Sequence, residues 1–187
     1  RIRGSSLNLE RINRVNDISR RCVRQPMPCE EIMAELMQVR EVRNYRPMTV
    51  TLAGGFIAMC FTPFFGGSLS DALAAFPIGM ATQFLVQKCE QLQINFIVRI
   101  ISTSVILTSA ALFLHQLGII RNTDSVIIGS LMLLVPGLAI TNAVRDSIGG
   151  DLLAGIIRAI EACLIAVAIA LGAGVTMSIW LSVSGGA

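Results

Sequence analysis

The chain has 187 residues and a formal net charge of +3, and 53% of its residues are hydrophobic while only 14% are charged. Together with a mean hydropathy of +0.69, this balance excludes an ordinary soluble domain of this size. Nearly all charged residues lie before Met48 or in short connectors between long uncharged runs. We therefore expect an all-α integral membrane protein with no nucleic-acid partner.

The start of the chain, Arg1, lacks the layout of a secretory signal, so we expect the sequence to be part of a longer protein. The five cysteines show no paired spacing with one another or with the single histidine, His115. We therefore expect free thiols, no metal site and no cofactor.

The first 47 residues carry two amphipathic helical patterns. Between Leu7 and Val23, apolar side chains recur every three or four positions and arginines occupy the other sides. A second pattern begins at Cys29, after two prolines, and has two glutamates in its favourable first turn. We expect residues 1–47 to form cytoplasmic helices that either pack on the membrane domain or anchor to anionic lipid.

Residues 48–187 are expected to form a transmembrane helical domain with about five crossings, because each apolar run is near or above the roughly 20 residues that a spanning helix needs. The runs cover residues 48–65, 71–86, 96–117, 125–144 and 152–183. In the last run, residues 162–183 are expected to lie in the bilayer, with a helical extension into water before them.

Basic residues set the expected orientation. Those of residues 1–46, Lys88, Arg145 and Arg158 fall on one side of the membrane in this arrangement, and Arg121 alone lies clearly on the other. The positive-inside rule then places the N-terminus in the cytoplasm and the C-terminus in the periplasm or outside the cell.

Two of the predicted spans contain a proline close to a glycine: Pro77 with Gly79, and Pro136 with Gly137. Proline removes a backbone donor and frees a carbonyl, which at membrane depth needs a partner in protein or in a water-filled cavity. We therefore expect both helices to be interrupted near their middles. Such interruptions mark binding sites in many transporters, and a simple kink healed by neighbouring hydroxyls is an equal alternative.

Four polar residues follow the second interruption. Thr141 and Arg145 are four positions apart, as are Asn142 and Asp146, so a continuing helix brings them onto adjoining faces. An arginine can hold a carboxylate through two parallel hydrogen bonds, while the amide and hydroxyl add neutral contacts. The cluster predicts a pathway or site for a small carboxylate solute; alternatively, Arg145 and Asp146 only mark the cytoplasmic end of the helix.

Three acidic residues near the membrane rim, Asp71, Asp151 and Glu161, are candidates for coupling transport to protons or cations. The loop with Gly66 and Gly67 precedes Asp71, which could instead cap a helix, and Glu161 could instead pair with Arg158. A stripe of small residues four positions apart is expected to form a helix-packing face. It consists of Ala162, Ala166, Ala170 and Gly174.

The runs PGLAITNAVRDSIGGDLLAGIIRAIEA, GGSLSDAL and RINRVNDISRR resemble the threonine/serine exporter family over most of the chain. The resemblance is most specific at Pro136, Gly137, Thr141, Asn142, Arg145, Asp146 and Asp151, and then at Gly66, Gly67 and Asp71. It implies a subunit of a bacterial inner-membrane exporter of small solutes such as threonine, serine or succinate. Because the chain resembles only the N-terminal half of the fused members, it also implies a separate small membrane subunit of the same family.

The leading hypothesis is a secondary exporter, not an enzyme, whose broken helices build a cavity near the midplane and whose transport an ion gradient drives. The sequence has no GxxxxGK[ST] loop, which argues against direct use of ATP. A non-transporting membrane scaffold or sensor is the alternative, and a homo-oligomer is left open. An intramembrane protease is disfavoured, because the only tyrosine precedes Arg46 rather than an aspartate and the sole histidine has no GxSxG partner.

Overall fold

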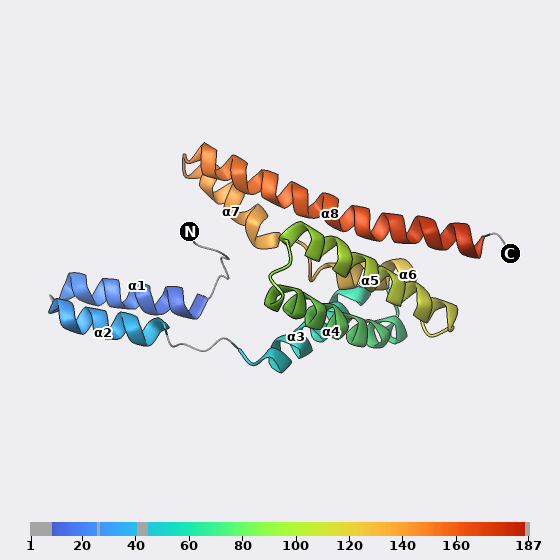
Figure 1. Ribbon diagram of the computed structural model, residues 1–187, viewed down its shortest axis with the longest axis horizontal. Coiled ribbons are helices and arrows are strands. Elements are labelled where there is room, and N and C mark those ends of the chain that lie inside the picture. Colours follow the sequence, from blue (N-terminus) through green and yellow to red (C-terminus); the bar gives the residue numbers. More distant parts are fainter. Residues whose placement is uncertain (1–8, 26, 41–44, 186–187) are drawn as a thin grey trace. The chain divides into compact units, whose positions relative to one another are not determined.

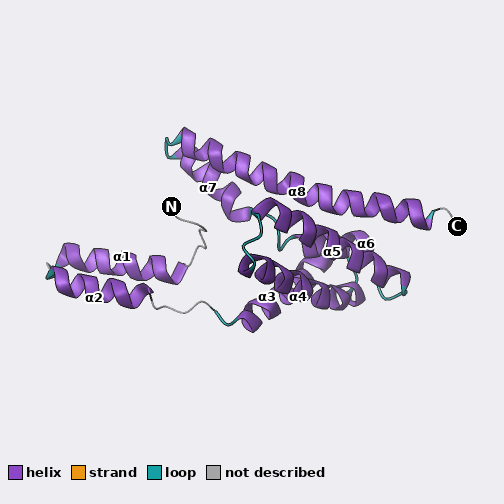
Figure 2. Ribbon diagram, viewed as in Figure 1, coloured by secondary structure: helices purple, strands orange, loops and turns teal. Residues whose placement is uncertain are grey.

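Eight α-helices make up the part of the chain that the computed structural model describes, residues 9–25, 27–40 and 45–185 (Figure 1). No strand occurs within those ranges (Figure 2). The chain divides into two compact units, Arg1–Arg46 and Pro47–Ala187. The protein is therefore all-α, as its sequence predicts.

The first unit contains the helices α1 (Leu9–Arg24) and α2 (Cys29–Arg40), which form a hairpin. Both begin with glutamates in their first turn, and such residues favour a helix start because they oppose the positive end of the helix dipole. Among its described residues, Ile18 of α1 and Val39 of α2 are the buried apolar ones. Few side chains are enclosed, so most of the hairpin surface is open.

The second unit contains four helices long and apolar enough to cross a membrane. They are α3 (Pro47–Phe64), α4 (Leu69–Gln91), α5 (Phe96–Gln116) and α8 (Leu152–Ser184). The remaining predicted span is helical but divided into α6 (Thr123–Leu131) and α7 (Gly137–Ile148). The chain is thus an integral membrane protein with four continuous spans and one Pro/Gly-broken helix.

Helix α4 runs without a break through Pro77 and Gly79, so the interruption predicted there is absent. Gly79 instead allows α3 to approach closely: a Cβ on it would lie 2.6 Å from the Cβ of Ala58 and 2.6 Å from the carbonyl oxygen of Gly54. Real Cβ atoms do not come so close. The glycine is therefore needed for helix packing, which apolar side chains alone would not drive in lipid.

Helices α5 and α8 also pack closely, through a different residue of α8 than expected. A Cβ on Gly172 would lie 2.7 Å from the Cβ of Ser104, whose hydroxyl donates a 3.0 Å hydrogen bond to the carbonyl of Ile169. Of the predicted small-residue stripe, Ala162 is buried, whereas Gly174 faces open space. Gly172 and Gly174 lie on nearly opposite sides of the helix, because residues two positions apart are about 200° apart around the helix axis.

The contact at Ser104 also shows how α5 and α8 are aligned along their axes. Since α5 and α8 run in the same direction and rise equally per residue, Phe96 lies level with about residue 162 of α8. The earlier part of α8 and its neighbour α7 therefore extend past the start of α5, as Figure 1 shows. We call α7 with residues 152–162 of α8 the α7–α8 arm.

Candidate functional site

The broken helix leaves backbone donors without acceptors. After α6 ends, two tight turns form, in which the amides of Leu133 and Leu134 donate to the carbonyls of Ser130 and Leu131 at 3.3 and 2.8 Å. Pro136 then occupies the position before α7, where its ring cannot cap the helix. The amides of Leu138 and Ala139 have no hydrogen-bond acceptor among the described residues.

These free donors make the start of α7 a place that favours negative charge. The exposed N–H groups and the helix dipole both act in that direction. A Cβ on Gly137 would meet no atom within 4 Å, so no side chain of the described chain covers this glycine. An anionic group can therefore approach the start of α7.

Two residues of the predicted polar cluster share the outer face of α7. Thr141 and Arg145 are exposed, one helical turn apart, and turn away from α8. The Thr141 hydroxyl donates a 2.9 Å hydrogen bond to the carbonyl of Gly137, whereas Arg145 makes no ion pair with any described residue. Asn142 is half-buried at the edge of this face. The Arg145 guanidinium is therefore free to bind a solute or a partner protein.

Asp146, the fourth member of the cluster, lies on the α8 side instead. Its carboxylate forms a 2.9 Å ion pair with Arg158. The alternative pairing of Arg158 with Glu161 is therefore wrong, because the return of α8 along α7 brings Asp146 nearer. Asp146 joins the two helices of the α7–α8 arm, close to the buried contact at Ala143.

An apolar groove of about 490 Å³ runs along α7 and α8, from the arm as far as Ala173. Pro136, Ile140 and Val144 line it from α7, and alanines with Cys163 line it from α8. Thr141, Asn142 and Arg145 are not among its lining residues. A polar recess was expected beside Pro136; the groove there is apolar, and the polar residues occupy other faces of α7.

Asp71, the first coupling candidate, is fully buried and bound by four donors. It accepts from the amide and hydroxyl of Ser68 at 3.0 and 2.6 Å. Its own amide donates to the Ser68 hydroxyl oxygen at 3.3 Å, which completes a capping box at the start of α4. It also accepts from the amides of Arg121 and Asn122, at 2.7 and 3.4 Å. Capping is therefore confirmed, and Asp71 also ties the α3–α4 loop to the start of α6.

The two glycines before Asp71 shape this loop. Gly66 has φ of +87°, which glycine adopts without the usual Cβ penalty. A Cβ on Gly67 would lie 2.6 Å from Cγ2 of Thr62. Both residues let the chain turn tightly enough to bring Asp71 to its donors.

The other coupling candidates differ in their contacts. Asp151 caps α8, because its carboxylate accepts a 3.1 Å hydrogen bond from the amide of Ala154. Glu161 is exposed on α8 and has no hydrogen bond or ion pair with the described residues. Of the three, Glu161 alone keeps its carboxylate free.

We expect Asp71→Asn to destabilise the membrane domain by about 2–4 kcal/mol, because the amide leaves buried backbone donors without a charged acceptor. Thermal unfolding in detergent would measure the change. Asp124→Asn is the matched control, since Asp124 is exposed and lies in the first turn of α6. Equal unfolding temperatures for the two variants would contradict a stabilising role for the hydrogen bonds of Asp71.

Comparisons with known proteins identify relatives along almost the whole chain. A model of the threonine/serine exporter family, ThrE, matches residues 1–180. "Probable succinate transporter subunit YjjP" of Escherichia coli (strain K12) is 27% identical over 144 residues, which cover 76% of this chain and 56% of that protein. No solved structure matches significantly.

Two fungal proteins also match, both named "Pheromone-regulated membrane protein 10". The protein of Kluyveromyces lactis is 28% identical over 180 residues, or 91% of this chain and 18% of its own length. The protein of Eremothecium gossypii is 29% identical over 180 residues, or 91% of this chain and 23% of its own length. The chain thus spans little more than half of YjjP and a smaller part of the fungal proteins.

Proposed function

Since the chain belongs to the threonine/serine exporter family, we propose that it is one subunit of a secondary transporter that exports small carboxylate solutes across the bacterial inner membrane. The observation that carries the proposal is the outer face of α7. There, the free donors at the broken helix and the unpaired Arg145 belong to one short helix. Both groups attract anions.

The spacing of these groups favours a solute with two negative ends. Gly137 and Arg145 are eight residues apart, or about 12 Å along a helix axis. The Arg145 side chain leans toward the start of α7, which shortens this gap. A dicarboxylate such as succinate could bridge the helix start and the guanidinium, whereas serine or threonine would bring its single carboxylate to one of them.

The transport pathway needs a second protein surface. Thr141 and Arg145 lie on an exposed face that nothing in the described chain covers, so this chain alone does not enclose a solute there. We assign the missing wall to a separate small membrane subunit of the same family. The related E. coli protein is itself named a subunit, which supports this assignment.

Glu161 is our choice for the coupling group. Asp71 and Asp151 cap helices, and protonating either would weaken the start of α4 or α8. Glu161 has no such role and lies on the same arm as Arg145. A proton or cation bound there would change the charge of the arm without unfolding a helix.

The positive-inside rule supports an N-terminus in the cytoplasm and a C-terminus in the periplasm. A phosphatase fused to the C-terminus should then be active, and a fluorescent protein fused there should be dark. An inactive phosphatase together with a fluorescent C-terminal fusion would reverse this orientation of the chain in the membrane.

Reconstitution tests the function. The chain would be placed in vesicles with and without the candidate partner subunit, and efflux of labelled succinate, serine and threonine would be measured under an imposed proton gradient. We expect gradient-dependent efflux only with both subunits, and fastest for succinate. No flux of any solute with both subunits present would favour the alternative, a membrane scaffold or sensor.

A further inference from the structure

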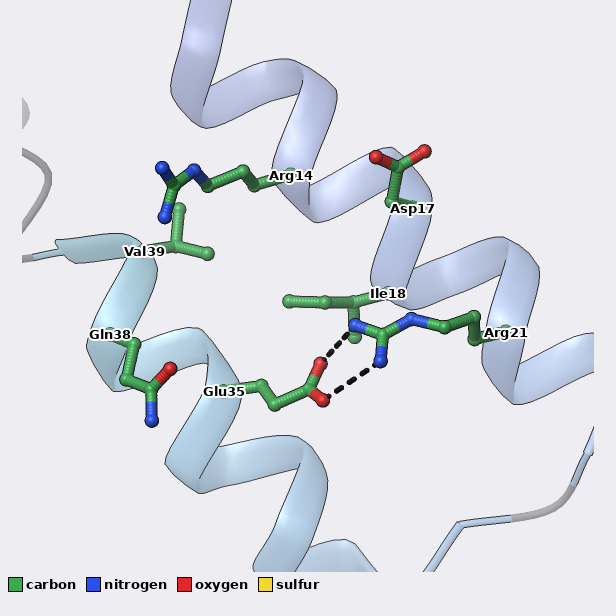
Figure 3. A pocket seen from close by; sticks show the side chains of 7 residues that line it. All are labelled: Arg14, Asp17, Ile18, Arg21, Glu35, Gln38 and Val39. Carbon is green, nitrogen blue, oxygen red and sulfur yellow. Dashed lines mark hydrogen bonds and ion pairs between the residues drawn. The ribbon is translucent and has the colours of Figure 1, made fainter.

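One side of the α1–α2 hairpin is charged (Figure 3). Arg14, Asp17 and Arg21 of α1 line a groove together with Glu35 and Gln38 of α2. Arg21 donates hydrogen bonds to both carboxylate oxygens of Glu35, at 3.0 and 2.5 Å. Ile18 and Val39 lie at the floor of this groove, between the two helices. The charged side is therefore organised by polar contacts within the hairpin.

The opposite side of the hairpin is apolar and open. With about 3.6 residues per turn, the exposed apolar residues of both helices fall away from the charged groove. Val23 is 84% exposed, Met37 is 64% exposed and Met33 is 58% exposed. The apolar side consists of Ile12, Val15 and Val23 from α1 and Met33, Leu36 and Met37 from α2.

A short linker joins the hairpin to the first spanning helix. Arg40, the end of α2, is seven residues before Pro47, where the first spanning helix begins. Seven residues span at most about 25 Å even when fully extended. The hairpin therefore cannot leave the neighbourhood of the membrane surface.

The charge of the unit also suits a membrane surface. Ten arginines and six acidic residues lie in residues 1–46, so most of the positive charge of the protein is there. Arg20 and Arg24 are exposed and make no ion pair with the described residues. Arg20 is three positions before Val23 and so borders the apolar side, where a long side chain can reach lipid head groups.

From these observations we infer that the α1–α2 hairpin binds the surface of an anionic bilayer, with its apolar side in the interface and its charged groove toward water. The buried area is modest and comes partly from two methionines, whose flexible side chains adapt to disordered neighbours. The arginines supply the remainder, since each contributes attraction to anionic head groups.

Quenching by brominated lipids tests the inference in the full chain within vesicles. In a Trp180→Phe background, which removes the only native tryptophan, the probe would be Met37→Trp on the apolar side and Gln38→Trp on the charged side. We expect vesicles with brominated phosphatidylglycerol to quench Met37→Trp about twofold or more, and to leave Gln38→Trp nearly unchanged. Equal quenching would overturn the inference.

Two further outcomes also count against it. A blue-shifted but unquenched Met37→Trp means that protein, not lipid, covers the apolar side, and a water-like emission means that nothing covers it. For the charge, Arg20→Gln with Arg24→Gln should lower the ratio of bound to unbound hairpin by about fivefold per arginine in phosphatidylglycerol vesicles. No difference between phosphatidylglycerol and phosphatidylcholine vesicles would remove the preference for anionic lipid.

Discussion

Replacing Gly79 with leucine is expected to prevent α3 and α4 from packing against each other. Because these two helices belong to the membrane domain, we expect the whole domain to fail to fold. Even the first carbon of the new side chain would lie 2.6 Å from Ala58 Cβ and from the Gly54 carbonyl oxygen, and 3.1 Å from the Cα of Gly55. Two of these three atoms are backbone, which cannot rotate aside. We expect a loss of about 3 kcal/mol or more, seen as failure to purify a monodisperse protein.

Gly174→Leu is the matched control, because a Cβ at Gly174 would meet no atom within 4 Å. Both glycines lie within spanning helices and receive the same side chain. The control should purify normally and unfold near the temperature of the parent. A Gly79→Leu protein as stable as the control would mean that α3 and α4 are further apart in the membrane than their glycines indicate.

The helices themselves follow closely from local sequence pattern. Apolar runs of sufficient length predict α3, α4, α5 and α8, and the Pro136–Gly137 pair predicts the break before α7, because proline lacks the donor that a continuing helix needs. Pro77 carries the same local signal, yet α4 continues through it. Close packing of α3 against Gly79 favours a continuous helix there, and one sequence does not show that neighbour.

The candidate site is less visible in the sequence, because its neighbours are distant along the chain. Asp71 meets the amides of Arg121 and Asn122 some 50 positions later. The capping pattern of Ser68 and Asp71 reveals half of that arrangement, and only the fold reveals the other half. Likewise, the four-residue spacing of Asn142 and Asp146 can be seen in the sequence, but it cannot show that Arg158 returns to bind Asp146.

Arg145→Gln is expected to lower carboxylate efflux by about 10- to 150-fold, because a hydrogen bond to a charged group contributes about 1.5–3 kcal/mol. Glutamine keeps a donor but loses the charge and the paired geometry. Arg145→Lys should recover part of the flux, since an ammonium keeps the charge without the planar fork. Initial rates in the reconstituted two-subunit transporter would give the comparison.

Arg121→Gln is the matched control, because the Arg121 side chain is exposed at the far end of the membrane domain and only its backbone amide binds Asp71. Co-purification of the two subunits separates two roles for Arg145. Lost flux with an intact complex indicates contact with the solute, whereas loss of the complex indicates an ion pair with a carboxylate of the partner. Flux equal to that of Arg121→Gln would remove Arg145 from the pathway, because an unpaired guanidinium that served transport could not lose its charge without effect.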